Sequence, residues 1–254
     1  MKKERTTEHF LSVNTKMKKL IRKIIATVLA LIILFVIGFC TYYAVIGYKE
    51  YKKVISEVPL KQKVEEMTSQ ENFVKKDQLP KIYIDAVIAA EDHNFYTHGA
   101  LSIVSTFRAV ITNLKDGEYS EGGSTITQQV AKNMYFSQKK TLKRKVAEMF
   151  VAFDIEKHYN KDEIFELYVN NIFFGSGYYN IYDAAMGYYG VEPIDLSDSQ
   201  ATILAGVPNA PSVYSPKNNT PLTYQRQKQV LDSMVEYGYL SADEAEMILA
   251  TKGE

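Results

Sequence analysis

The chain has 254 residues, 46% of them hydrophobic, and its 30 basic side chains balance 30 acidic ones. A neutral total gives no support to a nucleic-acid partner, because proteins that bind nucleic acid usually carry an excess of Lys and Arg. The single cysteine, Cys40, excludes an intramolecular disulfide, so the fold must be stable through its packed core alone.

Charge and hydrophobicity divide the N-terminal part into two segments. Residues 1–23 carry eight basic and two acidic side chains, and residues 24–48 carry no charge over 25 positions. A helix of that length spans roughly 37 Å, more than the roughly 30 Å of a bilayer's hydrocarbon core. We therefore predict a cytoplasmic basic tail at 1–23 and a transmembrane helix at 24–48, with the rest of the chain outside the cell membrane. A cleaved signal peptide is the alternative, which the length of the apolar run and the lack of a small-x-small cleavage site disfavour.

The rest of the chain has helical periodicity and no sustained alternation typical of strands. Residues 49–78 are polar and predict a partly helical stalk, followed by a domain at 79–254. Helices are expected at 80–90, 101–114, 141–158, 160–170 and 197–205, after Ser241, and after a cap at Ser124 or Thr125. In the 141–158 helix, the side chains expected to face inward are Leu142, Val146, Met149, Phe150 and Phe153. The predicted fold is mainly α.

Three blocks of the sequence carry chemistry. Residues 91–98 read Glu-Asp-His-Asn-Phe-Tyr-Thr-His, residues 121–129 read Glu-Gly-Gly-Ser-Thr-Ile-Thr-Gln-Gln, and residues 144–148 read Arg-Lys-Val-Ala-Glu. The glycines and small polar side chains of the middle block let N–H and hydroxyl donors approach a ligand closely. The first and third blocks each supply a carboxylate, and the third adds two cations. Proton transfer by carboxylates and stabilisation of an anionic leaving group by cations are what sugar transfer from a diphosphate requires.

In this order and spacing the blocks resemble the peptidoglycan glycosyltransferase family, whose members polymerise lipid II into glycan strands. The family pattern is Glu-Asp-x-x-Phe-x-x-His, then Gly-Gly-Ser-Thr-[Ile/Leu]-Thr-Gln-Gln, then Arg-Lys-x-x-Glu, and all three are present. Residues 161–170 and 206–211 also resemble family blocks, so the similarity covers roughly residues 79–249. One departure is that the family usually reads His-x-Gly where this chain has His98, Gly99 and Ala100. The resemblance implies a lysozyme-like lobe plus a small membrane-proximal lobe. It also implies the monofunctional form, which lacks the transpeptidase domain of bifunctional penicillin-binding relatives.

The resemblance further implies roles for particular residues. Glu91 is the expected general base, which takes the proton from the 4-hydroxyl of the acceptor sugar. Glu148 is the expected second catalytic carboxylate, in the donor site, where it would also hold a divalent cation, Mg or Mn. The expected substrate-binding residues are Ser124, Thr125, Gln128, Gln129, Lys132, Lys140, Arg144 and Lys145. The implied partners are lipid II, the growing glycan strand, the bacterial cell membrane and other cell-wall synthesis proteins.

Simpler interpretations of the same residues stay open. Glu148 beside Arg144 and Lys145 also fits a surface ion pair worth under about 1 kcal/mol, and the middle block also fits helix capping. His98 fits either substrate contact or a buried structural histidine. A hydrophobic patch fits either lipid contact or core packing; it comprises Phe107, Ile111 and Tyr119. For the whole protein, the alternatives are a lysozyme-like muralytic hydrolase or lytic transglycosylase, and an inactive membrane-anchored scaffold for wall synthesis.

Overall fold

The computed structural model describes residues 2–102, 123–137, 139, 141–218 and 220–251, with side chains from residue 17 onward except that of Asn218. Its elements are α1 (Lys2–Glu57), α2 (Leu60–Thr68), η1 (Lys76–Gln78), α3 (Lys81–Glu91), α5 (Ile126–Tyr135), α6 (Leu142–His158), α7 (Lys161–Val169), α8 (Ile181–Tyr189), η2 (Pro193–Asp195), α9 (Asp198–Gly206), η3 (Val207–Asn209), α10 (Pro211–Tyr214), η4 (Pro216–Asn218), α11 (Pro221–Glu236) and α12 (Ala242–Ala250). Apart from one bridge between Gly175 and Tyr178, the described residues contain no β-structure. The prediction of a mainly α fold is confirmed. The helix expected at 101–114, the patch at Phe107, Ile111 and Tyr119, and Lys140 lie outside the described residues.

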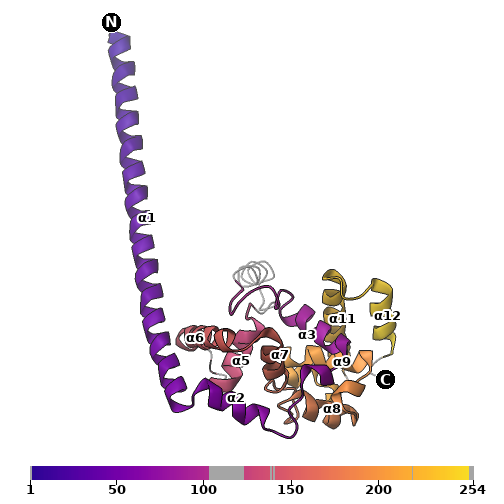
Figure 1. Cartoon of the computed structure of the whole chain (residues 1–254). Helices are drawn as coiled ribbons and strands as arrows, with labels where there is room; N and C mark the ends of the chain where they lie inside the picture. Colours follow the sequence, from indigo (N-terminus) through magenta and orange to yellow (C-terminus); the bar gives the residue numbers. More distant parts are fainter. Residues whose placement is uncertain (1, 103–122, 138, 140, 219, 252–254) are drawn as a thin grey trace.

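The helices form two groups that meet at the candidate site. Helices α5, α6 and α7 pack together beside the C-terminal end of α1, and α3, α9, α11 and α12 pack together beyond them (Figure 1). One hydrophobic core joins the two groups, with Tyr83 of α3, Ile126 of α5, Phe165 of α7 and Leu204 of α9 all buried in it. At the C-terminal end of α3, Glu91 accepts a hydrogen bond from Gln129 of α5, and this contact brings the first two sequence blocks together.

Helix starts follow the caps that the sequence predicts. The Thr125 hydroxyl accepts a hydrogen bond from the Gln128 backbone N–H, and the Gln128 side chain accepts one from the Thr125 N–H, so α5 begins with a capping box. Equivalent boxes begin three other helices, at Asn160 with Glu163, Ser197 with Gln200, and Ser241 with Glu244. Thr141 caps α6 by accepting from the Arg144 N–H. These local expectations are confirmed.

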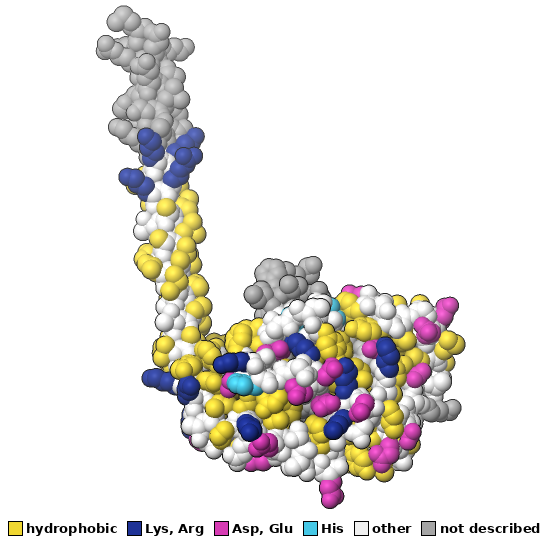
Figure 2. Space-filling view, in the orientation of Figure 1, with side chains coloured by type: hydrophobic (Ala, Val, Ile, Leu, Met, Phe, Trp, Pro, Cys, Tyr) yellow, Lys and Arg dark blue, Asp and Glu magenta, His cyan; other side chains and the backbone are white. Residues whose placement is uncertain are grey.

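Helix α1 runs without a break from the N-terminal tail into the domain. Among the described residues it is the one helix long and apolar enough to cross a membrane, judged by length and composition. Figure 2 shows hydrophobic side chains along its shaft and a group of Lys and Arg side chains toward its N-terminal end. Leu34 and Phe35 are 65% and 73% exposed. Such a shaft is unfavourable in water and suits lipid, so the helix fits a membrane anchor.

Residues 60–78, expected to belong to a stalk, pack against the domain. Leu60, Val64 and Met67 of α2 are buried in the shared core. Asn170 accepts a hydrogen bond from the Val74 N–H at 2.8 Å and donates one to the Val74 carbonyl at 2.7 Å. The apolar positions of α2 form a narrow stripe between charged residues, so the segment looks polar on average although one face is buried. The domain boundary at residue 79 stays a prediction.

The inward face of α6 differs from the one expected. The residues of α6 that are buried are Ala147, Glu148, Val151, Ala152 and Ile155. Leu142 and Phe153, which were expected inside, are 56% and 52% exposed. The expectation was therefore wrong for Leu142 and Phe153, whereas the other three residues, Val146, Met149 and Phe150, are half-buried.

Candidate active site

Glu91 is the last residue of α3, and two side chains from other helices reach its carboxylate. Gln129 of α5 donates a hydrogen bond from Nε2 to Glu91 Oε2 at 2.7 Å, and Arg226 of α11 places Nη2 3.8 Å from Glu91 Oε1. The Glu91 side chain is 13% exposed. A carboxylate that is oriented by an amide, and still partly open to solvent, can accept a proton from a bound hydroxyl group.

Arg226 reaches Glu91 because Gly206 leaves room for it. A Cβ on Gly206 would lie 2.9 Å from Arg226 Cγ, and Arg226 Nε donates to the Gly206 carbonyl at 3.3 Å. Gly206 therefore lets α11 bring a guanidinium past α9 to the end of α3. Sequence reasoning missed Arg226, since nothing in its spacing from the three blocks points to the site.

Two buried phenols lie near Glu91. Burial raises the pKa of Tyr168 well above its usual range, and the charge of Glu91 raises it further. The same two causes, in the same order, raise the pKa of Tyr83. Both phenols therefore stay neutral, so the surroundings of Glu91 on this side add no charge. The Tyr168 hydroxyl is fully buried and has no hydrogen-bond partner among the described residues.

Glu148 on α6 lies at the centre of a cation cluster. Its Oε1 is 3.1 Å from Arg144 Nε and its Oε2 is 3.4 Å from Lys145 Nζ, and its side chain is only 1% exposed. Lys145 Nζ also donates to Ser124 Oγ at 2.6 Å, and Arg144 Nη1 donates to the Ser137 carbonyl at 2.8 Å. The interpretation of Glu148 as a surface ion pair is therefore wrong, because the carboxylate is buried. A buried charge must be compensated, and two cations compensate this one.

Lys132 of α5 interacts electrostatically with both carboxylates. Burial is the largest effect and lowers the pKa of Lys132. The negative charges of Glu148 and Glu91 raise this pKa, and the positive charges of Arg144 and Lys145 lower it. The Lys132 ammonium group is therefore attracted by the charges of both Glu148 and Glu91. Lys132, Arg144 and Lys145 make a partly buried group of three cations around one carboxylate, so the cluster has excess positive charge and suits an anionic ligand.

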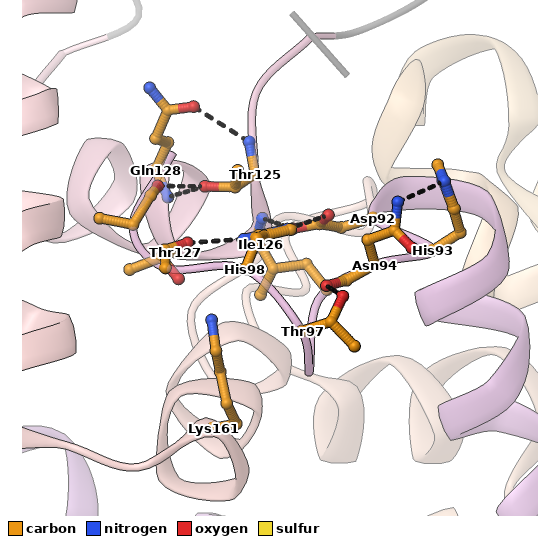
Figure 3. Close-up of polar contacts among 12 residues, drawn as sticks. Asp92, His93, Asn94, Thr97, His98, Thr125, Ile126, Thr127, Gln128 and Lys161 are labelled. Carbon is orange, nitrogen blue, oxygen red and sulfur yellow. Dashed lines mark hydrogen bonds and ion pairs between the residues drawn. The ribbon is translucent and has the colours of Figure 1, made fainter. Parts of the chain in front are cut away.

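The first and second sequence blocks are held together by Asp92 and His98. Asp92 Oδ1 lies 2.6 Å from His98 Nε2, and Asp92 Oδ2 accepts a hydrogen bond from the Ile126 N–H at 3.0 Å (Figure 3). His98 Nδ1 lies 2.6 Å from the Gly99 carbonyl. Both ring nitrogens of His98 therefore contact groups of the protein itself, which favours its interpretation as a structural histidine.

Thr125 and Gln128 use their side chains within the fold. Thr125 Oγ1 donates to the Ala100 carbonyl at 2.8 Å, and Gln128 completes the capping box. Thr127 Oγ1 donates to Glu156 Oε1 at 2.6 Å, which also receives Lys161 Nζ at 2.6 Å. These contacts hold the start of α5 in place, and Figure 3 shows those between Thr125 and Gln128. A substrate contact by Thr125 or Gln128 stays a prediction.

The structure thus brings together most of the predicted site. Around Glu91 and Glu148 it gathers Ser124, Gln129, Lys132, Arg144 and Lys145. A metal ion at Glu148 finds little support in the donor set, since no group of three His, Cys, Asp or Glu side chains converges within the described part of the chain. Both Glu148 oxygens already face cations. These residues alone do not fit a divalent cation.

The fold and the site together define a helical protein with an apolar N-terminal helix that fits a membrane anchor, two buried or half-buried carboxylates and a cluster of cations. Residues 57–235 match the family model described as Transglycosylase. A Cupriavidus necator protein named as a transglycosylase is 42% identical over 173 residues, which are 68% of this chain and 74% of that protein. Penicillin-binding protein 1A of Aquifex aeolicus is 40% identical over 174 residues, 68% of this chain and 24% of that protein. The crystal structure of penicillin-binding protein 1A from Haemophilus influenzae covers 70% of this chain and 17% of that one, with 24% identity and a TM-score of 0.42.

The chain belongs to the transglycosylase family. It spans about a quarter of the length of its Aquifex aeolicus relative.

Proposed function

We propose that the protein is a peptidoglycan glycosyltransferase that polymerises lipid II into β-1,4-linked glycan strands and releases undecaprenyl diphosphate. Membership of the transglycosylase family supports the reaction class. The observation that carries the proposal is the pairing of an oriented, partly open carboxylate at Glu91 with a cation cluster around Glu148. One part suits a proton acceptor and the other an anionic leaving group.

The proposed reaction needs one base and no enzyme nucleophile. The acceptor sugar's 4-hydroxyl oxygen forms a bond to C1 of the donor glycan, and its proton passes to Glu91. The bond between C1 and the diphosphate oxygen breaks, and the diphosphate leaves with the electron pair. A single displacement at C1 inverts the configuration, which turns an α-linked donor into a β-linked product.

Residues of the cluster would act mainly on the leaving group. Lys132, Arg144 and Lys145 carry positive charge that is present before the reaction and that binds the diphosphate more strongly as its charge grows. Glu148 keeps Arg144 and Lys145 in place through its two oxygens. Gln129 orients Glu91 toward the acceptor. A divalent cation stays a prediction, and none of these steps depends on one.

The proposed location is the outer face of a bacterial cell membrane. The basic tail before the apolar segment favours a cytoplasmic N-terminus, which puts the domain outside. An undecaprenyl chain keeps the substrate in the same bilayer as α1. The proposed partners are therefore lipid II, the growing strand and the membrane, together with other cell-wall synthesis proteins.

A single assay tests the proposal against its alternatives. The full-length protein, reconstituted in vesicles, is incubated with lipid II, and the products are separated into polymer, muropeptide fragments and unreacted substrate. Polymer with released diphosphate supports the proposal. Fragments from added peptidoglycan would instead identify a hydrolase or lytic transglycosylase, and unreacted material in both incubations would identify an inactive scaffold.

A further inference from the structure

The membrane anchor and the helix that carries Glu148 meet in an unusually close contact. Gly47 of α1 is buried against α6, and a Cβ at Gly47 would lie 2.5 Å from Val146 Cγ1, 2.8 Å from Val146 Cβ and 3.2 Å from the Ala147 backbone N. Gly38, higher in the same helix, has no heavy atom within 4 Å of such a Cβ. Only a glycine allows the two helices to approach this closely at position 47.

Further contacts lie on both sides of Gly47. Glu50 Oε2 is 2.5 Å from Lys143 Nζ, and the Tyr51 hydroxyl donates to Asp154 Oδ2 at 3.2 Å. The ring centroids of Tyr48 and Tyr51 lie 5.4 and 5.9 Å from that of Phe150. In sum, the contact runs along α6 from residue 143 to residue 154. We call these residues of α1 and α6 the anchor seat.

Along α6, residues that contact α1 are interleaved with residues of the cation cluster. Gly47 packs against Val146 and the backbone N of Ala147, and the next residue, Glu148, is the buried carboxylate of the cluster. Lys143 contacts Glu50 of the anchor, while its neighbour Arg144 contacts Glu148. A shift or rotation of α6 on α1 would therefore move the cluster relative to the anchor by the same amount.

The anchor seat and the diphosphate of a lipid-linked substrate are expected at the same depth, at the surface of the membrane. Gly47 is in the last turn of the uncharged segment 24–48, so the anchor seat lies where the hydrocarbon core ends. A prenyl lipid keeps its chain in that core, because withdrawing it costs about 0.8 kcal/mol for each CH₂ group. Its diphosphate therefore stays at the same level, and the cation cluster must be held there to bind it.

We propose that Gly47 is a positioning residue, which seats α6 on the anchor so that the cation cluster is held at a fixed height and rotation at the membrane surface. The inference rests on the proposed function, since it assigns the cluster to a membrane-embedded diphosphate donor. It adds that the anchor aligns the site as well as tethering it.

The test compares Gly47→Leu with the matched control Gly38→Leu, both in full-length protein in vesicles. For lipid II in the same vesicles, Gly47→Leu is expected to raise KM by roughly tenfold or more with a smaller change in kcat, a loss of ground-state binding. With a short-chain, water-soluble analogue the kinetics of this variant should stay near wild type, because a soluble substrate needs no fixed height. Gly38→Leu should match the wild type on both substrates. Equal losses on both substrates, or no loss on either, would overturn the inference.

A charge exchange covers the case in which Gly47→Leu fails to fold. Glu50→Lys and Lys143→Glu each place like charges together in the anchor seat, and the double variant restores an opposite pair. The single variants are expected to raise KM for lipid II, and the double variant to recover it. Failure of the double variant to recover would count against the positioning role.

A distance measurement separates this inference from the proposed function. Cys40 is the single cysteine of the chain, and Lys157 is an exposed residue near the end of α6, so Lys157→Cys allows a spin-label pair across the anchor seat. The distance distribution should be narrow in the otherwise wild-type protein and broad in Gly47→Leu. Wild-type protein that is inactive on lipid II would contradict the proposed function, and the spin-label distances would still test the role of Gly47. Distance distributions that are the same in wild type and Gly47→Leu would overturn that role.

Discussion

Gln129 of α5 donates a hydrogen bond to Glu91 of α3 at 2.7 Å, and this bond crosses the junction between the two helix groups. The second sequence block thereby orients the carboxylate of the first block. On the other side Arg226 approaches the second oxygen of the same carboxylate at 3.8 Å. Glu91 is thus positioned by helices from both groups, and its direction depends on how the groups are packed together.

Removing the charge of Glu91 is expected to stop the reaction and leave the fold intact. Glu91→Gln keeps the shape of the side chain and removes its ability to take a proton, so the polymerisation rate should fall at least about 100-fold. The matched control is Glu246→Gln on the exposed face of α12, which should keep full activity. Rates of lipid II polymerisation and thermal unfolding of both variants make the comparison. Near-normal turnover in Glu91→Gln would remove this residue as the base.

Glu148→Gln is expected to abolish polymerisation and to lower stability as well. Glu148 is 1% exposed and faces Arg144 and Lys145, so its loss leaves partly buried cations without their counter-charge. The effect on rate should not add to that of Glu91→Gln, since both residues serve one step. Kinetics of the two single variants and the double variant measure this. A Glu148→Gln protein that is active and only less stable would show a structural ion pair.

Lys132→Met is expected to weaken donor binding without destabilising the protein. Burial lowers the pKa of Lys132 from its usual 10.5, so the charged form is unfavourable in the folded state. Methionine fills a similar volume without charge, and the unfolding temperature near pH 7 should be unchanged or higher. The family resemblance implies inhibition by moenomycin, a phosphoglycolipid that mimics the donor glycan and its phosphate. Its affinity should fall by roughly 1.5–3 kcal/mol, the contribution of a charged hydrogen bond. Unchanged affinity in a titration would remove Lys132 from the donor site.

The same substitution predicts a pH dependence of stability. Between its lowered folded-state pKa and 10.5, Lys132 binds its proton less tightly in the folded state than in the unfolded chain. The unfolded state then holds more protons, so this residue makes the free energy of unfolding rise with pH in that range. The stability advantage of Lys132→Met over wild type should therefore shrink as the pH approaches 10.5. Urea unfolding of both proteins at several pH values measures it, and a gap that widens with pH would contradict the sign.

Arg226 is expected to affect turnover through Glu91. Arg226→Ala removes the group 3.8 Å from Glu91 Oε1, and kcat should fall by about tenfold with less change in KM, because orientation is lost. Gly206→Ala should act in the same direction and more weakly, since a Cβ there would lie 2.9 Å from the flexible Arg226 side chain. Lys228→Ala is the control on the same helix, where the side chain is 59% exposed. Equal kcat values in Arg226→Ala and Lys228→Ala would assign Arg226 a structural role.

Much of the local structure could be predicted from the sequence because it depends on neighbours a few residues apart. The capping box at Thr125 and Gln128 lies within one turn of helix, as does the box at Ser241 and Glu244. The membrane anchor depends on an uncharged run of 25 residues. The three blocks also indicated both carboxylates, because residue types and order alone carried the family resemblance.

The packing of distant segments decided the rest. Arg226 reaches Glu91 only because Gly206 admits its side chain between α9 and α11. The buried face of α6 depends on which helices cover it, so hydrophobicity alone placed Leu142 and Phe153 wrongly.

The anchor, the helix caps and the chemical types of the site residues can be predicted from the amino-acid sequence, since these follow from local hydrogen bonding, hydrophobic periodicity and residue order. The packing of Gly47 of the anchor against Val146 and the backbone of Ala147, next to Glu148, emerges only when the chain is folded. Such a contact depends on the shape of two surfaces that are far apart in the chain, and no local pattern encodes it. Because Gly47 has no side chain, α1 and α6 pack closely there, and close packing fixes the position of one helix on the other.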